Sequence, residues 1–263
     1  MERPTPENPR DHAHHPHRVP AQQATDSAEI PWAGRDLSPS GFEADLGIAD
    51  PMLRRLLADE VVGDVDDDRS LFTAIAQARF LVPVVAEPTE MTQVDGLLHD
   101  TGVDMAVVIL TGRDGQRALP VFTGLDALAA WDPAARPIPV TATRAAQAAV
   151  TDLCEVLVVD VAGPCTRVVR SSMLWALAQH QQWLPAHEDP QVDEAFAAAV
   201  DADPALTAYA LSGGTHGELR ARLTLVPGLT REQVTAVLTA LGERIAADGE
   251  VRARIDALSF TVS

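Results

Sequence analysis

Few residues in this chain combine the types and spacings that chemistry needs. The short patterns of phosphate loops, zinc-binding helices, serine hydrolases and redox dithiols do not occur in it. Gly213, Gly214 and Gly217 come nearest to a phosphate-binding loop. No Lys follows them and no helix pattern starts there, so we interpret them as a turn between strands, with a phosphate nest as the weaker alternative.

One aspartate and two cysteines are the other candidates. Asp160 ends the apolar segment EVLVVD, where open α/β sheets often hold catalytic carboxylates, and we take it as a candidate pocket residue. A turn-capping aspartate before Ala-Gly-Pro explains it equally well. Cys154 and Cys165 flank the same segment, but in a hairpin they would not face each other. We therefore interpret them as unpaired thiols and not as a redox pair.

The sequence predicts no metal site and no cofactor. The acidic run Asp64–Asp68 fits the first ligand positions of a calcium loop, but Arg69 stands where the loop needs Gly, and Ile75 stands where it needs Glu. We interpret the run as a solvated linker that places negative charge before a helix. His180 and His187 lack the spacing of metal ligands. An unstructured tract near the start of the chain holds four more histidines: His12, His14, His15 and His17.

Three of the four tryptophans offer a different kind of site. Trp131, Trp175 and Trp183 stand out because aromatic residues make up only 4% of the chain. The simpler interpretation is packing in the core, since Trp is usually largely buried. The alternative is that part of this set lines an exposed apolar patch that docks a partner protein.

Composition limits the classes of partner. The formal net charge is −18, and all 20 basic residues are Arg, as expected of a genome rich in G and C. A strongly acidic chain is repelled by phosphate backbones, so nucleic acid and anionic membranes are excluded as partners, whereas a basic protein fits. Two cysteines do not make a disulfide framework. The chain has neither the pattern of a signal peptide nor an apolar run of ~20 residues, and we expect it in the cytoplasm.

Hydrophobic periodicity predicts an α+β protein. The pattern gives helices at 51–62, 70–78, 124–131, 142–153 and 171–181, and strands at 80–86, 104–111, 117–122, 137–140, 155–161 and 166–170. These elements predict a mixed sheet with flanking helices. Pro83 cannot donate to a ladder, so its strand is expected at a sheet edge or bulged.

The remaining elements predict a smaller α+β layer, partly ferredoxin-like. They are a helix at 192–200, strands at 206–211 and 218–226, a helix at 230–247 and a strand at 251–262. We accordingly divide the chain into a disordered tail at 1–36, a domain at 37–187 and a small domain at 188–263. The segment PWAGRDLSPSGF, at residues 31–42, spans the boundary between the tail and the first domain. Its apolar residues Trp32 and Phe42 are expected to hold it against that domain.

A series of segments carries a resemblance to a known family. They are FLVPVVAE, DMAVVILTGRDGQRALPVFTGLDALAAWDPAARPIPV, VLVVDVAGP and SSMLWALAQHQQWLPAHEDP, with PWAGR before them and PGL at 227–229 after them. In this order they resemble the SseB family in its actinobacterial form. The resemblance implies an N-terminal SseB domain followed by a smaller C-terminal one. It implies no catalytic residue and no cofactor, and the family is named for enhanced serine sensitivity on overexpression.

The leading hypothesis is a non-enzymatic cytoplasmic protein that interacts with or regulates another protein. It depends on the lack of a recognisable site, the acidic composition and the resemblance. The alternative is an enzyme or small-molecule binder in serine or sulfur amino-acid metabolism, with a pocket near Asp160. A further alternative is an immunity-like protein that binds a toxin. The oligomeric state is not predicted.

Overall fold

A computed structural model of the chain describes residues 41–58, 65–87, 92–94, 97–99, 104–113 and 115–263. Residues 44–263 form one unit, and the following description concerns this unit. The predicted tail, its histidine tract and Trp32 lie outside the described residues. Among the described helices, none has both the length and the apolar character that crossing a bilayer requires.

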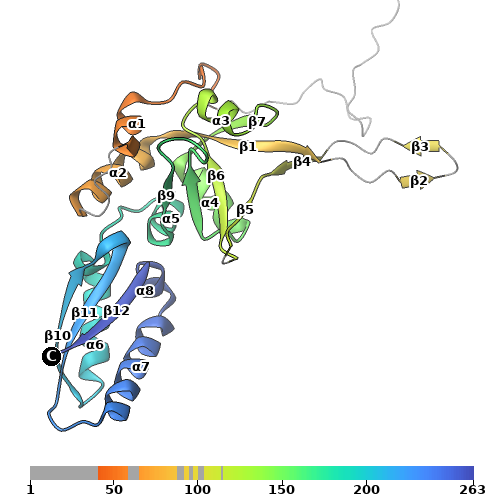
Figure 1. Cartoon of the computed structure of the whole chain (residues 1–263). Helices are drawn as coiled ribbons and strands as arrows, with labels where there is room; N and C mark the ends of the chain where they lie inside the picture. The colour runs from red at the N-terminus through yellow and green to blue at the C-terminus, as the bar shows by residue number, and fades with distance from the viewer. Residues whose placement is uncertain (1–40, 59–64, 88–91, 95–96, 100–103, 114) are drawn as a thin grey trace, which may run out of the picture. The chain divides into compact units, whose positions relative to one another are not determined.

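The elements follow one another with short connections (Figure 1). The helices are α1 (Pro51–Ala58), α2 (Val65–Gln77), α3 (Leu125–Trp131), α4 (Ala142–Thr151), α5 (Ser171–Ala178), α6 (Pro190–Asp201), α7 (Arg231–Ala247) and α8 (Gly249–Ala253). The strands up to residue 141 are β1 (Arg79–Glu87), β2 (Thr92–Val94), β3 (Leu97–His99), β4 (Asp104–Val107), β5 (Leu110–Thr111), β6 (Arg117–Val121) and β7 (Arg136–Thr141). The later strands are β8 (Val156–Val159), β9 (Arg167–Val169), β10 (Leu206–Gly213), β11 (Glu218–Leu225) and β12 (Ala257–Val262). Two 3₁₀ turns lie at Ala186–Glu188 and Thr215–Gly217.

Strand β1 is the centre of the first half of the fold. It pairs antiparallel with β7 on one side and with β4 on the other, in the order β4-β1-β7. A second sheet has the order β5-β6-β8-β9, in which β6 and β8 are parallel. The bridge between Leu81 and Phe122 connects the two sheets, because each residue donates its N–H to the other's carbonyl at 2.8 and 2.9 Å.

The prediction that Pro83 lies at a sheet edge or in a bulge is wrong. Leu81 directs its backbone groups toward Phe122, and the carbonyl of Pro83 accepts from Val108 on the same side at 3.4 Å. Pairing of β1 with β4 begins only at Val84. The missing N–H of Pro83 therefore falls where β1 changes neighbours from β6 to β4, and the ladder loses only the bond that this nitrogen would donate to the Val108 carbonyl.

Two prolines also define the outer edge of β7. Pro83 lies opposite Pro137, and Leu81 lies opposite Pro139. Because the polar groups of Leu81 and Pro83 face away from β7, these are the non-hydrogen-bonded pairs of the antiparallel ladder, and both partners turn their backbone nitrogens outward. The edge of β7 thus lacks two N–H donors that another strand would need.

Helices α4 and α5 cover the second sheet. The face of α4 is made of four alanines, none more than 1% exposed: Ala142, Ala145, Ala146 and Ala149. Small side chains allow the helix to approach the sheet closely, and they pack with the fully buried Phe80, Leu119 and Leu157 in one core. The first turn of α4 is capped by Thr141, whose hydroxyl accepts from the N–H of Arg144.

Strands β10, β11 and β12 form a separate three-stranded sheet (Figure 1). β10 and β11 are antiparallel, whereas β11 and β12 are parallel and connected through α7 and α8. Alternate residues of β11 are buried, and they pack with Phe196 of α6 and Leu241 of α7. One face of the sheet thus carries the helices, and the strand–strand–helix–strand order of the predicted small layer is present. Its division from the first domain at 187/188 stays a prediction.

The α+β class is confirmed, and most elements lie close to their predicted ranges. Asp50 caps α1, and Thr230 with Gln233 forms a capping box at the start of α7. Three details differ. Helix α2 begins at Val65, so Ser70 is not its cap, and the predicted strand at 104–111 divides between β4 and β5 in different sheets. The segment 251–262 is predicted as one strand, but its first residues belong to helix α8, and the strand β12 begins only at Ala257.

Replacing both outer prolines of β7 tests whether they keep this edge strand from pairing with another chain. In Pro137→Thr/Pro139→Thr the two outward N–H groups return, and the free energy of unfolding is expected to fall by about 1 kcal/mol because the unfolded chain gains freedom. Light scattering below the unfolding midpoint is expected to rise faster than in the unchanged protein, because the edge can then pair with other chains. Pro133→Thr, at an exposed proline between α3 and β7, is the matched control. Equal aggregation of both variants would contradict the role of the edge.

Candidate functional site

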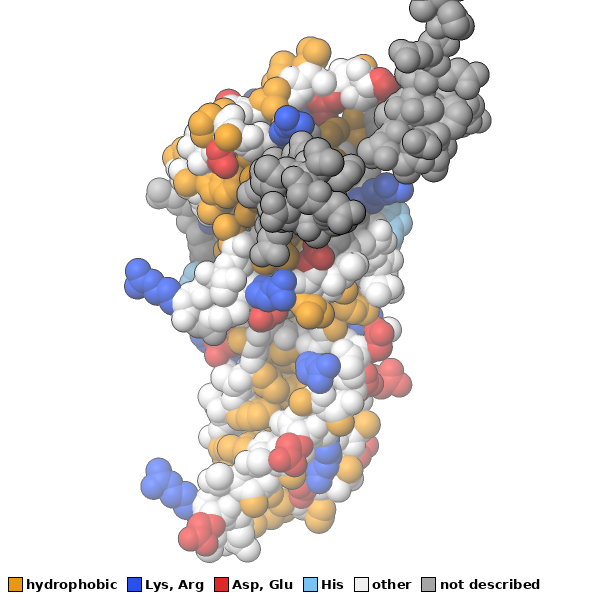
Figure 2. All heavy atoms as spheres, turned by 90° about the vertical axis from the view of Figure 1, so that its right-hand side faces the viewer, with side chains coloured by type: hydrophobic (Ala, Val, Ile, Leu, Met, Phe, Trp, Pro, Cys, Tyr) orange, Lys and Arg blue, Asp and Glu red, His pale blue; other side chains and the backbone are white. Residues whose placement is uncertain are grey.

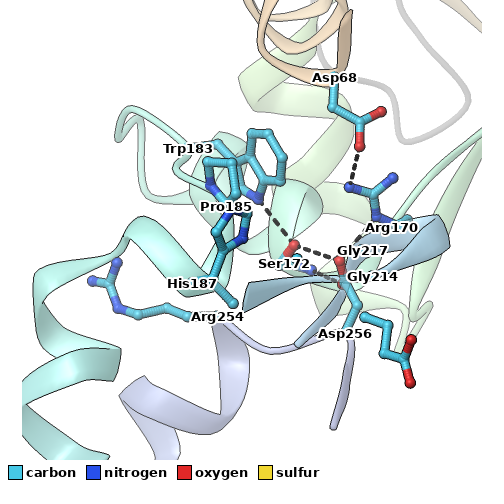
Figure 3. A pocket seen from close by; sticks show the side chains of 13 residues that line it. Asp68, Arg170, Ser172, Trp183, Pro185, His187, Gly214, Gly217, Arg254 and Asp256 are labelled. Carbon is cyan, nitrogen blue, oxygen red and sulfur yellow. Dashed lines mark hydrogen bonds and ion pairs between the residues drawn. The ribbon is translucent and has the colours of Figure 1, made fainter. Parts of the chain in front are cut away.

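A cluster of polar side chains links the helices of the first half of the fold to the segment before β12 (Figure 3). We call Asp68, Arg170, Ser172, Trp183 and Asp256 the Arg170 cluster. Arg170 donates to Asp68 from Nη2 and to Asp256 from Nε, both at 2.9 Å. Asp256 also accepts from the backbone N–H and the hydroxyl of Ser172 at 2.8 Å each.

Local structure explains why these groups meet. Arg170 is the N-cap residue of α5 and makes no side-chain cap there, so the first N–H groups of this helix need another acceptor. Asp256 supplies that acceptor at Ser172, at the helix end where a negative charge is favoured. Asp68 reaches Arg170 from the first turns of α2. The prediction that the acidic run is a solvated linker is therefore wrong for Asp68.

Two arginines of this region lie over tryptophan rings. The Arg170 guanidinium lies 5.6 Å from the ring centre of Trp183, whose indole N–H donates to Ser172 Oγ at 3.0 Å. Arg254 lies 4.7 Å from the ring centre of Trp175 and donates to Asp189 at 2.8 Å. Planar guanidinium groups suit such stacking because they keep their hydrogen bonds in the plane while the face contacts the ring.

The electrostatics of the Arg170 cluster favour a permanent positive charge on Arg170. Burial acts against that charge, but the hydrogen bond with Asp68 and the charges of Asp68 and Asp256 outweigh it. The pKa of Arg170 therefore lies above its ordinary value. Both carboxylates and the guanidinium are held at roughly one-tenth to one-fifth exposure, so their mutual attraction is screened little by solvent.

The space beside the Arg170 cluster is small. The cavity measures about 20 Å³, which accommodates about one water molecule. Sites for small molecules typically have volumes of roughly 300–1,000 Å³. The cluster therefore joins elements through hydrogen bonds and ion pairs and leaves no room for a substrate the size of an amino acid.

The glycines at 213–217 form part of the wall of this cavity. A Cβ on Gly217 would lie 2.6 Å from Nε of Arg170, and a Cβ on Gly213 would lie 2.8 Å from the ring of His187. Gly217 also has a φ of +79°, which favours glycine. The segment turns the chain from β10 to β11, as the turn interpretation predicts, and its glycines allow side chains of other elements to approach closely.

Asp160 lies at the carboxyl end of β8 and is 7% exposed. Its carboxylate accepts from the N–H of Thr123 at 2.8 Å and from the Thr123 hydroxyl at 2.7 Å. Thr123 follows β6, so Asp160 ties together the ends of two parallel strands. The N-cap residue of α3 is Gly124, and no side chain caps this helix. A cavity of about 410 Å³ lies beside Asp160, with Arg54, Asp126 and Cys165 in its wall.

The three predicted docking tryptophans do not share one surface. Trp131 packs on Phe122 with ring centres 5.3 Å apart, in a small cluster around Leu128. Trp175 and Trp183 belong to the main core, where Trp183 is 6% exposed. A docking role for any of them stays a prediction.

One edge of Trp183 reaches a groove between α2 and the end of α5. This groove, called the α2–α5 groove below, has a volume of about 380 Å³. Its floor is apolar and contains Phe72, Leu177, Trp183 and Leu184. Its rim is polar and contains Arg69, Thr73, Gln77, Thr143, His180, Gln181 and Gln182. Sequence reasoning pointed to Trp183 but missed the groove, whose two walls are about 100 residues apart in the chain.

The remaining candidates make no site within the described residues. Cys154 and Cys165 are both free, and burial raises the pKa of the Cys154 thiol, which lowers its reactivity. His180 lies just after α5 with a φ of +56°, and its Nδ1 is 3.3 Å from the hydroxyl of Thr143. Where the chain is described, no three His, Cys, Asp or Glu side chains gather as metal ligands would.

The fold is that of an α+β protein with mixed sheets. Residues 53–176 match a family model described as SseB protein N-terminal domain. Over these residues the chain thus carries an SseB N-terminal domain, as the resemblance predicted. No curated protein and no solved structure matched the chain. The actinobacterial form and the C-terminal domain of the family stay predictions, since the match ends before residue 177.

Removing one carboxylate of the Arg170 cluster is expected to destabilise the protein strongly. Asp256→Ala leaves the N–H and hydroxyl of Ser172 without an acceptor and removes one of the two anions beside Arg170. The free energy of unfolding is expected to fall by about 3 kcal/mol, measured by urea denaturation. Asp126→Ala, which breaks the exposed pair with Arg54, is the matched control and is expected to cost below about 1 kcal/mol. Equal losses in both variants would show that the cluster contributes no special stability.

Proposed function

We propose that this chain is a non-enzymatic cytoplasmic protein of the SseB family that binds another protein through the α2–α5 groove. The groove carries the proposal, because it joins an apolar floor to a rim of hydrogen-bonding side chains. Apolar centres surrounded by polar rims are the usual anatomy of protein–protein contacts. Its volume of about 380 Å³ suits a few anchoring side chains of a partner helix or extended segment.

The floor of the groove supplies rigid contacts. Phe72 and Trp183 are packed against each other with ring centres 6.0 Å apart, and Trp183 is fixed by its bond to Ser172. Side chains that are already ordered lose little conformational entropy on binding. Ser172 and Arg170, which contact Trp183 within the Arg170 cluster, therefore also position the floor of the groove.

The charge pattern indicates what the groove would accept. Its lining contains no Asp or Glu, although acidic residues outnumber basic ones by 38 to 20 in the chain. Arg69 on the rim pairs with Glu188, and the other rim groups are amides, hydroxyls and the His180 ring. A segment with two or three apolar anchors and uncharged polar flanks complements such a lining. The net charge of −18 would steer a partner that is basic elsewhere on its surface.

Filling the groove tests the proposal. Ala76 of α2 is exposed on the groove wall, and Ala76→Arg places a long charged side chain over the apolar floor. Tagged protein is used to capture partners from cells of the source organism, with quantitative mass spectrometry as the readout. Proteins bound through the groove are expected to be depleted at least tenfold in Ala76→Arg. Ala198→Arg, at an exposed alanine of α6, is the matched control and is expected to retain them.

The two variants also define the result that contradicts the proposal. Each must first show an unfolding midpoint close to that of the unchanged protein, so that a loss of binding is not a loss of folding. If every captured protein is retained equally by Ala76→Arg and Ala198→Arg, the α2–α5 groove is not the binding surface.

A second candidate function, binding of a small amino acid, is favoured by the cavity beside Asp160. Its volume of about 410 Å³ lies within the range of ligand sites. Both Nη2 contacts of Arg54 to Asp126 measure 2.5 Å, and this pairing lowers the pKa of Asp126 and raises that of Arg54. A cation beside an anion complements the carboxylate and ammonium of an amino acid. Asp160 itself is occupied by Thr123 and would shape the cavity without contacting the ligand.

Thermal shift with free amino acids tests this second candidate. Serine is the first ligand to try because of the sensitivity for which the family is named. A saturable rise of the unfolding midpoint with serine, absent in Arg54→Met, is the expected result, because a ligand that binds only the folded state stabilises it. No rise with any amino acid at millimolar concentration would contradict it. Arg144→Met, an exposed arginine of α4 that does not line the cavity, is the matched control.

A further inference from the structure

Most strand edges in the described part of the fold carry a feature that discourages pairing with another chain. The edge strands β5, β9 and β4 are only two, three and four residues long. β7 turns Pro137 and Pro139 outward, and the register of β10 shifts between Leu206 and Ala208. Short strands, charges, prolines and bulges are the known protections of natural sheet edges.

Strand β12 carries none of these features. It is six residues long, with the sequence ALSFTV, and its only neighbour in the described sheet is β11. Its six pairs with β11 are consecutive, without a register shift. The strand contains no proline, no glycine and no charged residue. By the criteria that the other edges meet, β12 is open.

The parallel register shows which backbone groups of β12 are unpaired. The N–H of Ser263 donates to the carbonyl of Leu223 at 3.0 Å, so Ser263 and every second residue before it direct their polar groups toward β11. The intervening residues Leu258, Phe260 and Val262 direct theirs to the opposite side. These three have no backbone partner among the described residues, so three N–H and three C=O groups line the free edge.

The side chains beside this edge are apolar on one face and small and polar on the other. Leu258 and Phe260 are half-buried next to the helix layer, where Cε2 of Phe260 lies 3.7 Å from a Cβ built on Gly242 of α7, and Val262 is 47% exposed. Ser259 and Thr261 occupy the other face. Figure 2, which views the right-hand side of Figure 1, shows hydrophobic side chains gathered in its lower half, with charged side chains around them.

We propose that β12 is a self-association edge that pairs antiparallel with β12 of a second copy of this chain. In the matching register Phe260 lies opposite Phe260 of the second copy, and Leu258 lies opposite Val262. Because these are the residues with outward polar groups, all three pairs are hydrogen-bonded pairs, which together make six bonds. The same register places Ser259 opposite Thr261 on the polar face and joins two three-stranded sheets into one of six strands.

The strand β12 is complementary to itself, and this property favours a second copy of the chain as its pairing partner. A twofold axis through Phe260 brings apolar residues opposite apolar residues and hydroxyl residues opposite hydroxyl residues, as an isologous interface requires. The strand itself brings no charged side chain to the pairing, because ALSFTV has none. Charge repulsion between two copies at −18 each acts over the whole molecules and is screened beyond about 8 Å at physiological salt.

The test introduces into β12 an outward-facing proline of the kind that β7 already has at Pro137 and Pro139. Val262→Pro removes one outward N–H but no bond to β11, and proline is compatible with an edge strand. Val262→Thr keeps that N–H and is the matched control. Sedimentation velocity at physiological salt is expected to show a concentration-dependent dimer for the unchanged protein and for Val262→Thr, and at least a tenfold weaker dimer for Val262→Pro.

A disulfide experiment tests the register independently. Ser259 and its partner Thr261 of the second copy form non-hydrogen-bonded pairs, whose Cα atoms lie about 4.5 Å apart, within reach of a disulfide. Under mild oxidation Ser259→Cys/Thr261→Cys is expected to give a covalent dimer. Each single variant brings only one thiol to each pair and is expected to remain uncrosslinked, as is the unchanged protein with Cys154 and Cys165.

Three results would overturn the proposal. The first is a monomer at all concentrations for the unchanged protein. The second is a dimer that Val262→Pro does not weaken, because it would then use another surface. The third is crosslinking of a single variant as efficient as that of the double variant. If the monomeric protein instead binds an extended peptide and loses it in Val262→Pro, the edge serves a strand of another protein and not a second copy.

Discussion

The first half of the fold depends on satisfying the backbone of one buried strand. The core of β1 is apolar and almost fully buried, so each of its N–H and C=O groups needs a partner inside the protein. Three strands provide them: β7 along one side, and β6 and then β4 along the other. The single position without an N–H, Pro83, coincides with the change of neighbour. A proline in a central strand thus costs the ladder only the one bond that its nitrogen would donate.

A second constraint is the cost of burying charge. Arg170 cannot lose its proton, so its burial requires anions on two sides, and Asp68 and Asp256 provide them. These residues are 102 and 86 positions from Arg170 in the chain. No local pattern reveals such partners, which is why the acidic run was interpreted as a linker. Trp183, by contrast, was singled out by its rarity alone, and the contacts that fix it follow from the same arginine.

Local signals were the most reliable guide to the fold. The predicted strand at 117–122 and the predicted helix at 124–131 depend on residues within a few positions of one another, and β6 and α3 lie there. The errors occurred where tertiary pairing decides. The segment 104–111 is continuous and apolar, yet it serves two sheets, and the alternation after Val251 includes a helical turn. Periodicity shows that a segment is buried on one face, but it does not show which neighbour it pairs with.

The order in which the chain is synthesised gives Pro83 a further consequence. Every strand that pairs with β1 lies later in the sequence, the last of them ending at Thr141. During translation β1 therefore emerges as an apolar segment whose partners do not yet exist, a state in which nascent chains on neighbouring ribosomes can aggregate. A proline in its middle interrupts any such premature ladder, in the manner of a gatekeeper residue. The same residue is then accommodated with the loss of a single ladder bond once β4, β6 and β7 have been made.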